Sequence, residues 1–276
     1  MVPVNSTQLR LAPTRVHNGT YDAQVGPGAA TSFVSWGDTV TATRTTPRSS
    51  RLWFLSSMRS SVGKKWAMAL SGIALLGFIV SHLLGNLKIY FGPEQINDYG
   101  EALRDLGGHL APRTHVLWAV RFGLAAAFAI HIIAAVLISL ENRNKRGERY
   151  QHRPDYHYVT YASRTMLWSG IIVAAFVLFH LADLTWGNAN PDFVRGDVYS
   201  NLVVSFERVP VAALYIVANL ALGLHIYHGM WSLFRTMGVA NPRFNQLRRM
   251  LAMGTTAAIT VGNLSFPIMV QAGVIS

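Results

Sequence analysis

Five of the ten histidines lie within long stretches of sequence that contain no charged side chain, namely His82, His131, His180, His225 and His228. Ionisable side chains at membrane depth are rare, and they indicate a functional site by default. Neutral imidazole is a good ligand for iron, and two imidazoles fill both axial positions of a haem, which favours electron transfer over oxygen chemistry. These histidines therefore point to redox chemistry inside a membrane.

Five stretches without Asp, Glu, Lys or Arg define the elements that must position these rings. They contain 22, 19, 18, 26 and 27 residues. A helix needs about 20 apolar residues to cross about 30 Å of hydrocarbon, and a backbone in lipid must satisfy its own hydrogen bonds. We therefore expect an all-α membrane protein, a bundle of five transmembrane helices near residues 66–90, 114–140, 162–186, 209–234 and 250–274.

The basic residues predict the orientation of this bundle. Of the 24 Lys and Arg residues, 18 lie in the N-terminal segment and in the second and fourth connections, which share one side of the membrane. The positive-inside rule places that side in the cytoplasm, with the N-terminus there and the C-terminus outside. The basic inner face either contacts anionic lipid or docks a soluble partner. A net charge of +11 with only 13% charged and 51% hydrophobic residues points to lipid, not to nucleic acid.

Alternating helix directions sort four of the histidines into two depths. The intervals between His82, His131, His180 and His225 are 49, 49 and 45 residues, so each falls on a different predicted helix. His82 lies ~24 Å along a helix that starts inside, and His131 lies a similar distance along a helix that starts outside. We therefore expect His82 to meet His180 near the outer side, and His131 to meet His225 near the inner side. His228 shares a helix face with His225 and is the alternative ligand.

The lack of cysteine limits the cofactors that this chain can hold, and the composition of the N-terminus indicates how the chain is divided into domains. Without cysteine the chain can form no disulfide, no cysteine-ligated iron–sulfur cluster and no c-type haem attachment. Residues 1–58 are rich in Thr, Ser, Pro, Gly and Val without a helical period, which predicts a flexible cytoplasmic extension. Residues 59–276 form the expected five-helix membrane domain, and Met58 is an alternative start of the protein.

Structural packing and zinc binding are the alternatives to haem. A single buried histidine is more often a hydrogen-bonded packing residue than a ligand, but four on four helices, paired by depth, favour a shared cofactor. Zinc would need further ligands nearby, and pairs separated by most of the membrane lack them. Small residues near the histidines, such as Ser71, Gly85 and Ala134, would leave room for a macrocycle, although close helix packing in lipid uses small residues too.

Segments of the first and fourth predicted helices resemble a known family. The segments are KWAMALSG at 65–72, GF at 77–78, HLLGNL at 82–87 and HIYHGMWSLFR at 225–235. They are similar to the cytochrome b membrane-anchor subunit of succinate dehydrogenase, in the five-helix, di-haem type of the succinate:menaquinone oxidoreductase and fumarate reductase family. The resemblance covers residues 60–276, with a histidine in each of the first four helices and none in the fifth.

The resemblance implies two b haems and a quinone substrate, for which menaquinone is the family habit. The family's ligand on the fourth helix precedes a glycine by four positions. Here that glycine is Gly229, which selects His225. The family pairs the first helix with the third for the distal (outer) haem and the second with the fourth for the proximal (inner) haem.

The resemblance also implies partners and a location. A flavoprotein subunit with FAD oxidises succinate, and an iron–sulfur subunit passes the electrons to the anchor from the cytoplasmic face. The chain would thus be part of respiratory complex II, which joins the tricarboxylic acid cycle to the respiratory chain in the bacterial plasma membrane. It would carry electrons through the haems to the quinone without oxidising succinate by itself.

The expected quinone site lies near the outer haem. Protonation of a reduced quinone needs a titratable group or a water path, and Glu101 in the outer connection is the candidate, with a solvated surface carboxylate as the alternative. Arg121 is the most deeply placed cation and is expected to pair with the outer haem. Some fumarate reductase relatives carry a proton-conducting Glu two residues before the fourth-helix ligand. Gly223 stands there in this chain, so that proton path is not expected.

Two other functional classes are compatible with apolar helices that carry histidines. The haem b anchor of a formate dehydrogenase or hydrogenase would place its ligands differently and dock its partner on the outer side. A transporter or a haem-free structural anchor would use the histidines for packing and would be colourless. A transporter is expected to show repeated halves and charges near the midplane, and the lack of an evident repeat and the few charges within the predicted helices argue against it.

Overall fold

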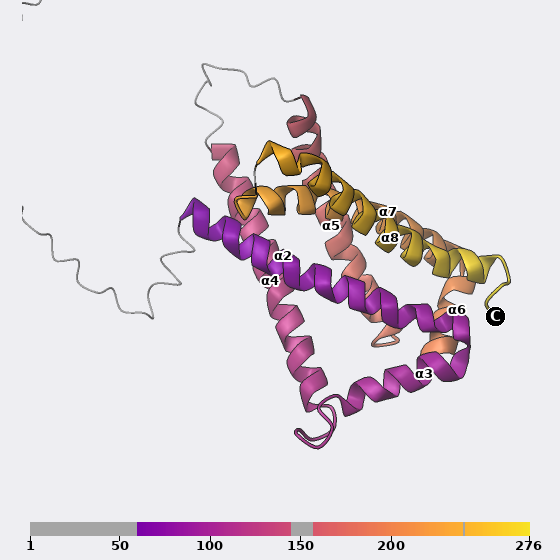
Figure 1. Cartoon of the computed structure of the whole chain (residues 1–276). Coiled ribbons are helices and arrows are strands. Elements are labelled where there is room, and N and C mark those ends of the chain that lie inside the picture. Colours follow the sequence, from indigo (N-terminus) through magenta and orange to yellow (C-terminus); the bar gives the residue numbers. More distant parts are fainter. Residues whose placement is uncertain (1–59, 145–156, 240) are drawn as a thin grey trace, which may run out of the picture. The chain divides into compact units, whose positions relative to one another are not determined.

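The computed structural model of the chain describes residues 60–144, 157–239 and 241–276, and within these ranges it is helical without a strand. Five helices are long and apolar enough to cross a membrane (Figure 1). They are α2 (Ser61–Asn86), α4 (His115–Asn144), α5 (His157–Leu184), α7 (Val209–Thr236) and α8 (Asn245–Gln271). The prediction of an all-α fold with five such helices is confirmed for this part of the chain. The predicted extension of residues 1–58 lies outside the described residues.

The helices continue past the charge-free stretches at the ends rich in Lys and Arg. α2 and α5 begin at residues 61 and 157, whereas the predicted spans begin at 66 and 162. α8 likewise begins at residue 245 and not at 250, and α4 ends at 144 and not at 140. A charge-free stretch measures the hydrocarbon core, whereas a helix can extend into the interface, where long basic side chains reach water. The predicted boundaries were therefore too short at these ends.

Short helices that the sequence analysis did not predict connect the long ones. α3 (Pro93–Ala102) follows α2 and the 3₁₀ helix η1 (Leu87–Phe91), and α6 (Val198–Glu207) precedes α7. Gly92, with φ of 100°, ends η1, because this left-handed backbone region suits glycine. The remaining 3₁₀ helices are η2 (Leu103–Asp105) and η4 (Pro242–Phe244).

An aspartate at the start of α6 joins the two short helices. The Asp197 carboxylate caps α6 by accepting from Ser200 N at 3.0 Å, and it also accepts from Asn97 Nδ2 of α3 at 3.1 Å. Asn97 Oδ1 in turn accepts from the backbone N–H of Val198 at 2.8 Å. Side-chain caps of this kind satisfy the free N–H groups of a helix start, so α3 and α6 are held together through their ends.

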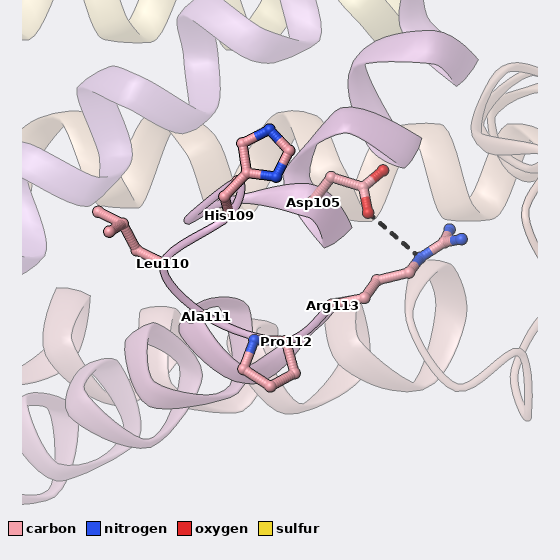
Figure 2. Close-up of a pocket in the computed structure, with 7 residues that line it drawn as sticks. Asp105, His109, Leu110, Ala111, Pro112 and Arg113 are labelled. Carbon is pink, nitrogen blue, oxygen red and sulfur yellow. Dashed lines mark ion pairs between the residues drawn. The ribbon is translucent and has the colours of Figure 1, made fainter.

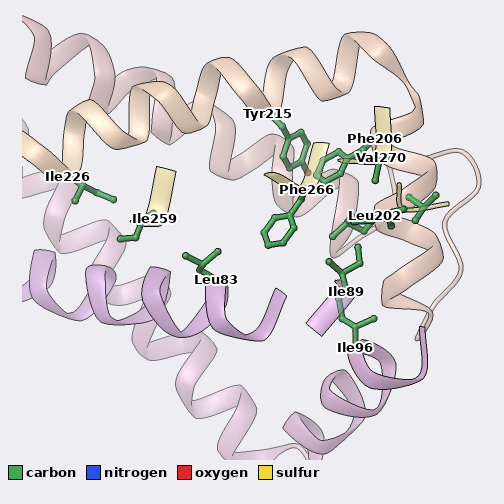
Figure 3. Close-up of a cluster of buried hydrophobic side chains, with 12 residues drawn as sticks. Leu83, Ile89, Ile96, Leu202, Phe206, Tyr215, Ile226, Ile259, Phe266 and Val270 are labelled. Carbon is green, nitrogen blue, oxygen red and sulfur yellow. The ribbon is translucent and has the colours of Figure 1, made fainter. Parts of the chain in front are cut away.

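The long helices pack most extensively as α2 with α4, α5 with α7, and α7 with α8, and α2 also contacts α7 and α8. A buried hydrophobic cluster lies among α2, α3, α6, α7 and α8 (Figure 3). In contrast, α4 and α5 expose large apolar side chains, including Trp118, Phe122, Ile133, Trp168 and Ile171. Apolar exposure of this kind is expected of helices that face lipid.

The two ends of the helices differ in composition. At one end α2 and α5 finish, α4 and α7 begin, and α3 and α6 lie against each other; we call this the α6 end. At the opposite end, the basic end, the helix termini carry Lys64, Lys65, Arg143, Arg235, Arg243, Arg248 and Arg249. The basic end corresponds to the face predicted to be cytoplasmic.

Candidate functional site

The four histidines expected to act together lie as two pairs. The ring centres of His82 on α2 and His180 on α5 are 5.9 Å apart, with an interplanar angle of 84°. The ring centres of His131 on α4 and His225 on α7 are 6.2 Å apart, with an angle of 66°. We name these the His82–His180 pair and the His131–His225 pair. The partners within each pair are those that the helix depths predict.

Serines of the neighbouring helices hold both rings of the His131–His225 pair. Nδ1 of His131 lies 3.2 Å from Oγ of Ser71 on α2. Nδ1 of His225 lies 3.3 Å from Oγ of Ser169 on α5. Both serines are buried, at 7% and 5% exposure, so neither bond competes with water. Ser71, expected as a small residue near a haem, thus contacts a histidine directly.

A glycine after each of these serines lets the imidazole approach the helix. A Cβ atom at Gly72 would lie 3.4 Å from Cε1 of His131, and one at Gly170 would lie 3.4 Å from Cε1 of His225. This separation is already a tight contact, and any larger side chain would push the ring away. His131 therefore lies against α2 in the same manner as His225 lies against α5.

In the other pair, His180 is held by hydrogen bonds that lead to a buried acid. Nδ1 of His180 lies 3.2 Å from Oη of Tyr215, and Tyr215 Oη donates to Oδ2 of Asp183 at 2.9 Å. Ser205 on α6 donates to the same Oδ2, and Arg208 donates from Nη2 to Oδ1 at 2.6 Å. Asp183 is completely buried, and its position at the end of α5 places it three residues after His180.

An internal repeat relates α2 to α5. Five residues of α5 follow their counterparts on α2 by 98 positions; the sets are Met68, Ser71, Gly72, Phe78 and His82, and Met166, Ser169, Gly170, Phe176 and His180. The repeated residues make repeated contacts, because each phenylalanine ring lies within 6 Å of the histidine ring that follows it. Each serine also donates to the backbone carbonyl of the methionine three residues before it, at 3.1 Å in both helices. The His82–His180 pair thus joins the two helices that share the repeat, α2 and α5.

The ring separations match those of two ligands on one metal ion. Because Nδ1 of His131, His180 and His225 faces a hydroxyl group, Nε2 is the nitrogen left for a metal. Two metal–nitrogen bonds of about 2 Å, with each ring centre about 1 Å beyond its nitrogen, place the ring centres roughly 6 Å apart. The observed 5.9 and 6.2 Å agree with this value.

The two pairs lie at different depths along the helices. Ser71, which contacts His131, precedes His82 by 11 residues on α2, and Ser169, which contacts His225, precedes His180 by 11 residues on α5. At 1.5 Å per residue this spacing corresponds to roughly 16 Å along each helix. The His82–His180 pair lies toward the α6 end and the His131–His225 pair toward the basic end.

His228 and Arg121 lie apart from the two pairs. Nε2 of His228 is 3.4 Å from Oγ1 of Thr165 on α5, so the ring that faces His131 is that of His225. Arg121 is exposed on α4, with its guanidinium 5.0 Å from the ring centre of Trp118 on the same helix. Its expected contact with the outer haem stays a prediction.

Glu101, the candidate for quinone protonation, lies on α3 as a half-exposed carboxylate. It forms ion pairs with Arg104, at 2.7 Å, and with Arg113. The same Arg113 lies 3.5 Å from Asp105 at the edge of an open hollow of about 460 Å³, which the connection before α4 encloses (Figure 2). The hollow is lined by residues 105 and 108–113, and the histidine pairs take no part in it.

At two glycines in helix interfaces, a side chain of the neighbouring helix occupies the space that a Cβ atom would need. At Gly223 of α7 a Cβ atom would collide with Thr260 of α8, so a glutamate at this position would not fit the present packing. At Gly85 of α2 a Cβ atom would collide with the ring of Tyr99 on α3. Gly85 was expected to leave room for a macrocycle. In the structure it admits a tyrosine ring instead, so it serves helix packing.

Several residues that contact the rings or their partners were not predicted from the sequence, among them Ser169, Asp183 and Tyr215. The repeated spacing of Met, Ser, Gly, Phe and His would have pointed to Ser169 as the counterpart of Ser71. Asp183 is the first charged residue after the third charge-free stretch. A charge at that place in the sequence is expected to lie at the membrane surface, whereas Asp183 is buried. Tyr215 carries no local signal, because only the packing of α5 against α7 brings it to His180.

Comparison with protein-family models, with curated proteins and with solved structures finds no match to this chain. Among the residues that the structure describes, no group of three or more His, Cys, Asp or Glu side chains could hold a metal ion by itself. Each pair offers two imidazoles from two different helices. Two imidazole ligands suit a metal whose remaining ligands come from a macrocycle, such as haem iron.

Proposed function

We propose that this chain is the di-haem cytochrome b membrane anchor of a succinate:quinone oxidoreductase, with menaquinone as the expected quinone. The observation that carries the proposal is the pair of imidazole contacts, with ring centres at 5.9 and 6.2 Å, between helices that cross the membrane. The family assignment rests on the resemblance of residues 65–87 and 225–235 to the anchors of that family.

In this proposal the four histidines would hold the iron of two b haems. Two such haems would supply one-electron transfer between the two depths of the membrane. Ser71 and Ser169 orient the imidazoles of the His131–His225 pair, and Tyr215 orients that of His180. Hydrogen bonds at Nδ1 select the tautomer whose Nε2 is free for the metal. The apolar surroundings exclude water from both positions.

The internal repeat supports a shared ligand in each pair. The corresponding residues His82 and His180 lie with their ring centres 5.9 Å apart, and the rings of His131 and His225 lie 6.2 Å apart, both pairs in an edge-on arrangement. A planar macrocycle has two similar faces, and a repeated unit on each side offers the same ligand to both. Packing alone does not require an ionisable ring at each of these four positions in an apolar interior.

The basic end is the proposed docking surface for the iron–sulfur subunit, which would lie with the FAD-containing flavoprotein in the cytoplasm. Lysines and arginines gather there on the termini of α2, α4, α7 and α8. Arg248 does not belong to the exposed set, since it is buried and its guanidinium lies 5.5 Å from the centre of the Trp231 ring. Lys65, Arg235, Arg243 and Arg249 are the candidates for contact with a partner.

Haem content tests the proposal directly. The purified membrane complex is measured by a dithionite-reduced minus oxidised spectrum and by a pyridine-haemochrome count per chain. We expect two b haems in the wild type. His82→Ala and His180→Ala should each lose one haem, and His131→Ala and His225→Ala should each lose the other. The matched control is His228→Ala, one helical turn from His225, which should keep both.

The outcome also separates the alternative classes. A chain without haem would make the histidines packing residues and would favour a transport or structural protein. Two haems in a complex that lacks a succinate-oxidising flavoprotein would favour the anchor of another respiratory dehydrogenase. Co-purification of flavoprotein and iron–sulfur subunits, lost on neutralising Lys65 and Arg249, would support docking at the basic end.

The proposed role of Glu101 needs a separate measurement. Glu101→Gln should sharply lower the rate of quinone reduction while haem content stays at two per chain. Glu94→Gln, at the start of the same helix α3, is the matched control. Wild-type turnover in Glu101→Gln would remove the carboxylate from the reaction and leave it as the partner of Arg104 and Arg113.

A further inference from the structure

We propose that Tyr215 and Asp183 are positioning residues that make His180 a stronger electron donor than the histidines of the His131–His225 pair. The inference rests on the proposed function, because it concerns histidines as ligands of haem iron. It predicts that the iron held by His82 and His180 has the lower reduction potential of the two. The groups responsible lie outside the ligand set and were not expected from the sequence.

His180, Tyr215 and Asp183 are hydrogen-bonded in series, and we call this series the relay. Tyr215 Oη donates its proton to Oδ2 of Asp183 over 2.9 Å, so at the 3.2 Å contact with Nδ1 of His180 the tyrosine oxygen accepts and the imidazole N–H donates. The hydroxyl group that accepts the imidazole proton is thus itself polarised by a carboxylate. Hydrogen bonds in such a series strengthen one another, and the effect is larger in an apolar interior than in water.

The carboxylate is held in place from two further sides. Arg208 binds Oδ1 through Nη2 at 2.6 Å, and its Nη1 donates to the backbone carbonyl of Ala189 at 2.8 Å. Ser205, which is completely buried, donates to Oδ2 beside Tyr215. A fully buried carboxylate is costly unless it is paired and hydrogen-bonded, and these partners meet that requirement. Tyr215 is therefore one of several donors to a fixed acceptor.

In the part of the chain that the structure describes, no acid is bonded to the groups that hold the other pair. The rings of His131 and His225 contact the neutral hydroxyl groups of Ser71 and Ser169. The internal repeat shows the same asymmetry, because the residue 98 positions before Asp183 is Gly85. The ring of Tyr99 occupies the space beside Gly85. The acid therefore occurs in only one copy of the repeat, next to one of the two pairs.

The expected direction of the effect follows from the charge. An imidazole whose N–H is drawn toward an anion gains electron density at its other nitrogen and becomes a better donor to iron. A better donor stabilises the oxidised metal more than the reduced metal. The potential of that site therefore falls relative to a site whose histidines contact neutral hydroxyl groups.

Redox titration of the purified, haem-loaded complex tests the proposal. Tyr215→Phe removes one hydroxyl group and ends the relay. We expect the reduction potential of the haem held by His82 and His180 to rise. At a fixed applied potential its oxidised-to-reduced ratio should fall about tenfold, which corresponds to an upward shift of about 59 mV for a one-electron couple. The other haem should keep its potential. The matched control is Tyr199→Phe on α6, where Oη donates to the backbone carbonyl of Ser276 at 3.1 Å and reaches neither pair.

A second variant keeps the test decisive if the phenylalanine variant loses haem. Asp183→Asn preserves an acceptor for Tyr215 and removes the negative charge, so it should raise the same potential with two haems still bound. Unchanged potentials in both variants, or equal shifts of both haems, would overturn the proposal while leaving the di-haem function intact. Absence of haem from the wild-type complex would overturn both.

Discussion

The His131–His225 pair and the His82–His180 pair differ in the groups that hold their rings. In the first, each Nδ1 faces a buried serine hydroxyl one helix away, and the two halves of the arrangement are nearly equal. In the second, His180 is connected through Tyr215 to a completely buried Asp183. The same repeated unit thus supports one symmetric pair and one asymmetric pair.

This difference follows from where each pair lies. The His131–His225 pair lies toward the basic end, where the repeated Ser and Gly residues of α2 and α5 face it. The His82–His180 pair lies toward the α6 end, where α6 adds Ser205 and the residue before α7 is Arg208. α3 and α6 occupy different connections and have different sequences. The repeat is therefore kept at the Ser, Gly, Phe and His residues of α2 and α5, and it is lost at Asp183 near the end of α5, whose counterpart on α2 is Gly85.

The largest expected effect is the loss of one haem from a single glycine substitution. Gly72→Val and Gly170→Val would each push a branched side chain into a histidine ring that already lies 3.4 Å from the Cβ position. Each variant should lose the haem of the His131–His225 pair and keep the other, as counted by pyridine haemochrome.

Gly77→Val is the matched control for these variants, because it lies on the same helix with no atom within 4 Å of its Cβ position. It should keep two haems per chain. If Gly72→Val also kept both haems, the close approach of His131 to α2 would have no part in ligand placement.

A smaller effect, on stability, is expected at the other pair. Asp183→Ala leaves Arg208, Tyr215 and Ser205 without their shared acceptor, and breaking a buried ion pair costs about 3–5 kcal/mol. Thermal unfolding in detergent, followed by the helical circular dichroism signal, measures the change. Glu101→Ala removes two ion pairs between partly exposed side chains, each of which should contribute about 1 kcal/mol or less. Equal costs for the two variants would contradict the buried role of Asp183.

The smallest effect is an acid-dependent loosening of α6. Hydrogen bonds from the backbone and side chain of Ser200 hold the pKa of Asp197 below its ordinary value of 3.8. A lowered pKa stabilises the fold above the ordinary value, and this contribution is lost as the pH falls through the folded pKa. Helix caps contribute about 1 kcal/mol, so acid should destabilise the α6 end by about that amount.

Asp197→Asn should remove this part of the acid dependence, because asparagine still caps the helix and does not titrate. Hydrogen exchange of the α6 amides between pH 5 and pH 3 measures the effect. The amides of α2 near Ser71, toward the basic end, serve as the internal reference. Equal pH dependence in wild type and Asp197→Asn would show that the cap does not control α6.

The pairing of the histidines could be predicted mainly from their spacing in the sequence. Charge-free stretches locate helices because hydrocarbon excludes charge, and helix rise converts residue number into depth. These two facts suffice to match His82 with His180 and His131 with His225. They do not choose between His225 and His228, since both share a helix face. The tertiary structure makes that choice, because the ring of His225 lies opposite His131 while His228 lies beside Thr165.

The sequence by itself determined five apolar helices, the depths of their histidines and a repeated Ser-Gly-Phe-His spacing, because these depend on local composition and helix geometry. The tertiary structure alone decided what each ring touches. Ser205, Arg208 and Tyr215 reach Asp183 from α6, from the residue before α7 and from α7, across 22, 25 and 32 residues of chain. These contacts depend on how the helices and connections pack, and no local spacing encodes them. The sequence thus contained the repeat and its departure, Asp183 where α2 has Gly85, and only folding decided which groups that acid contacts.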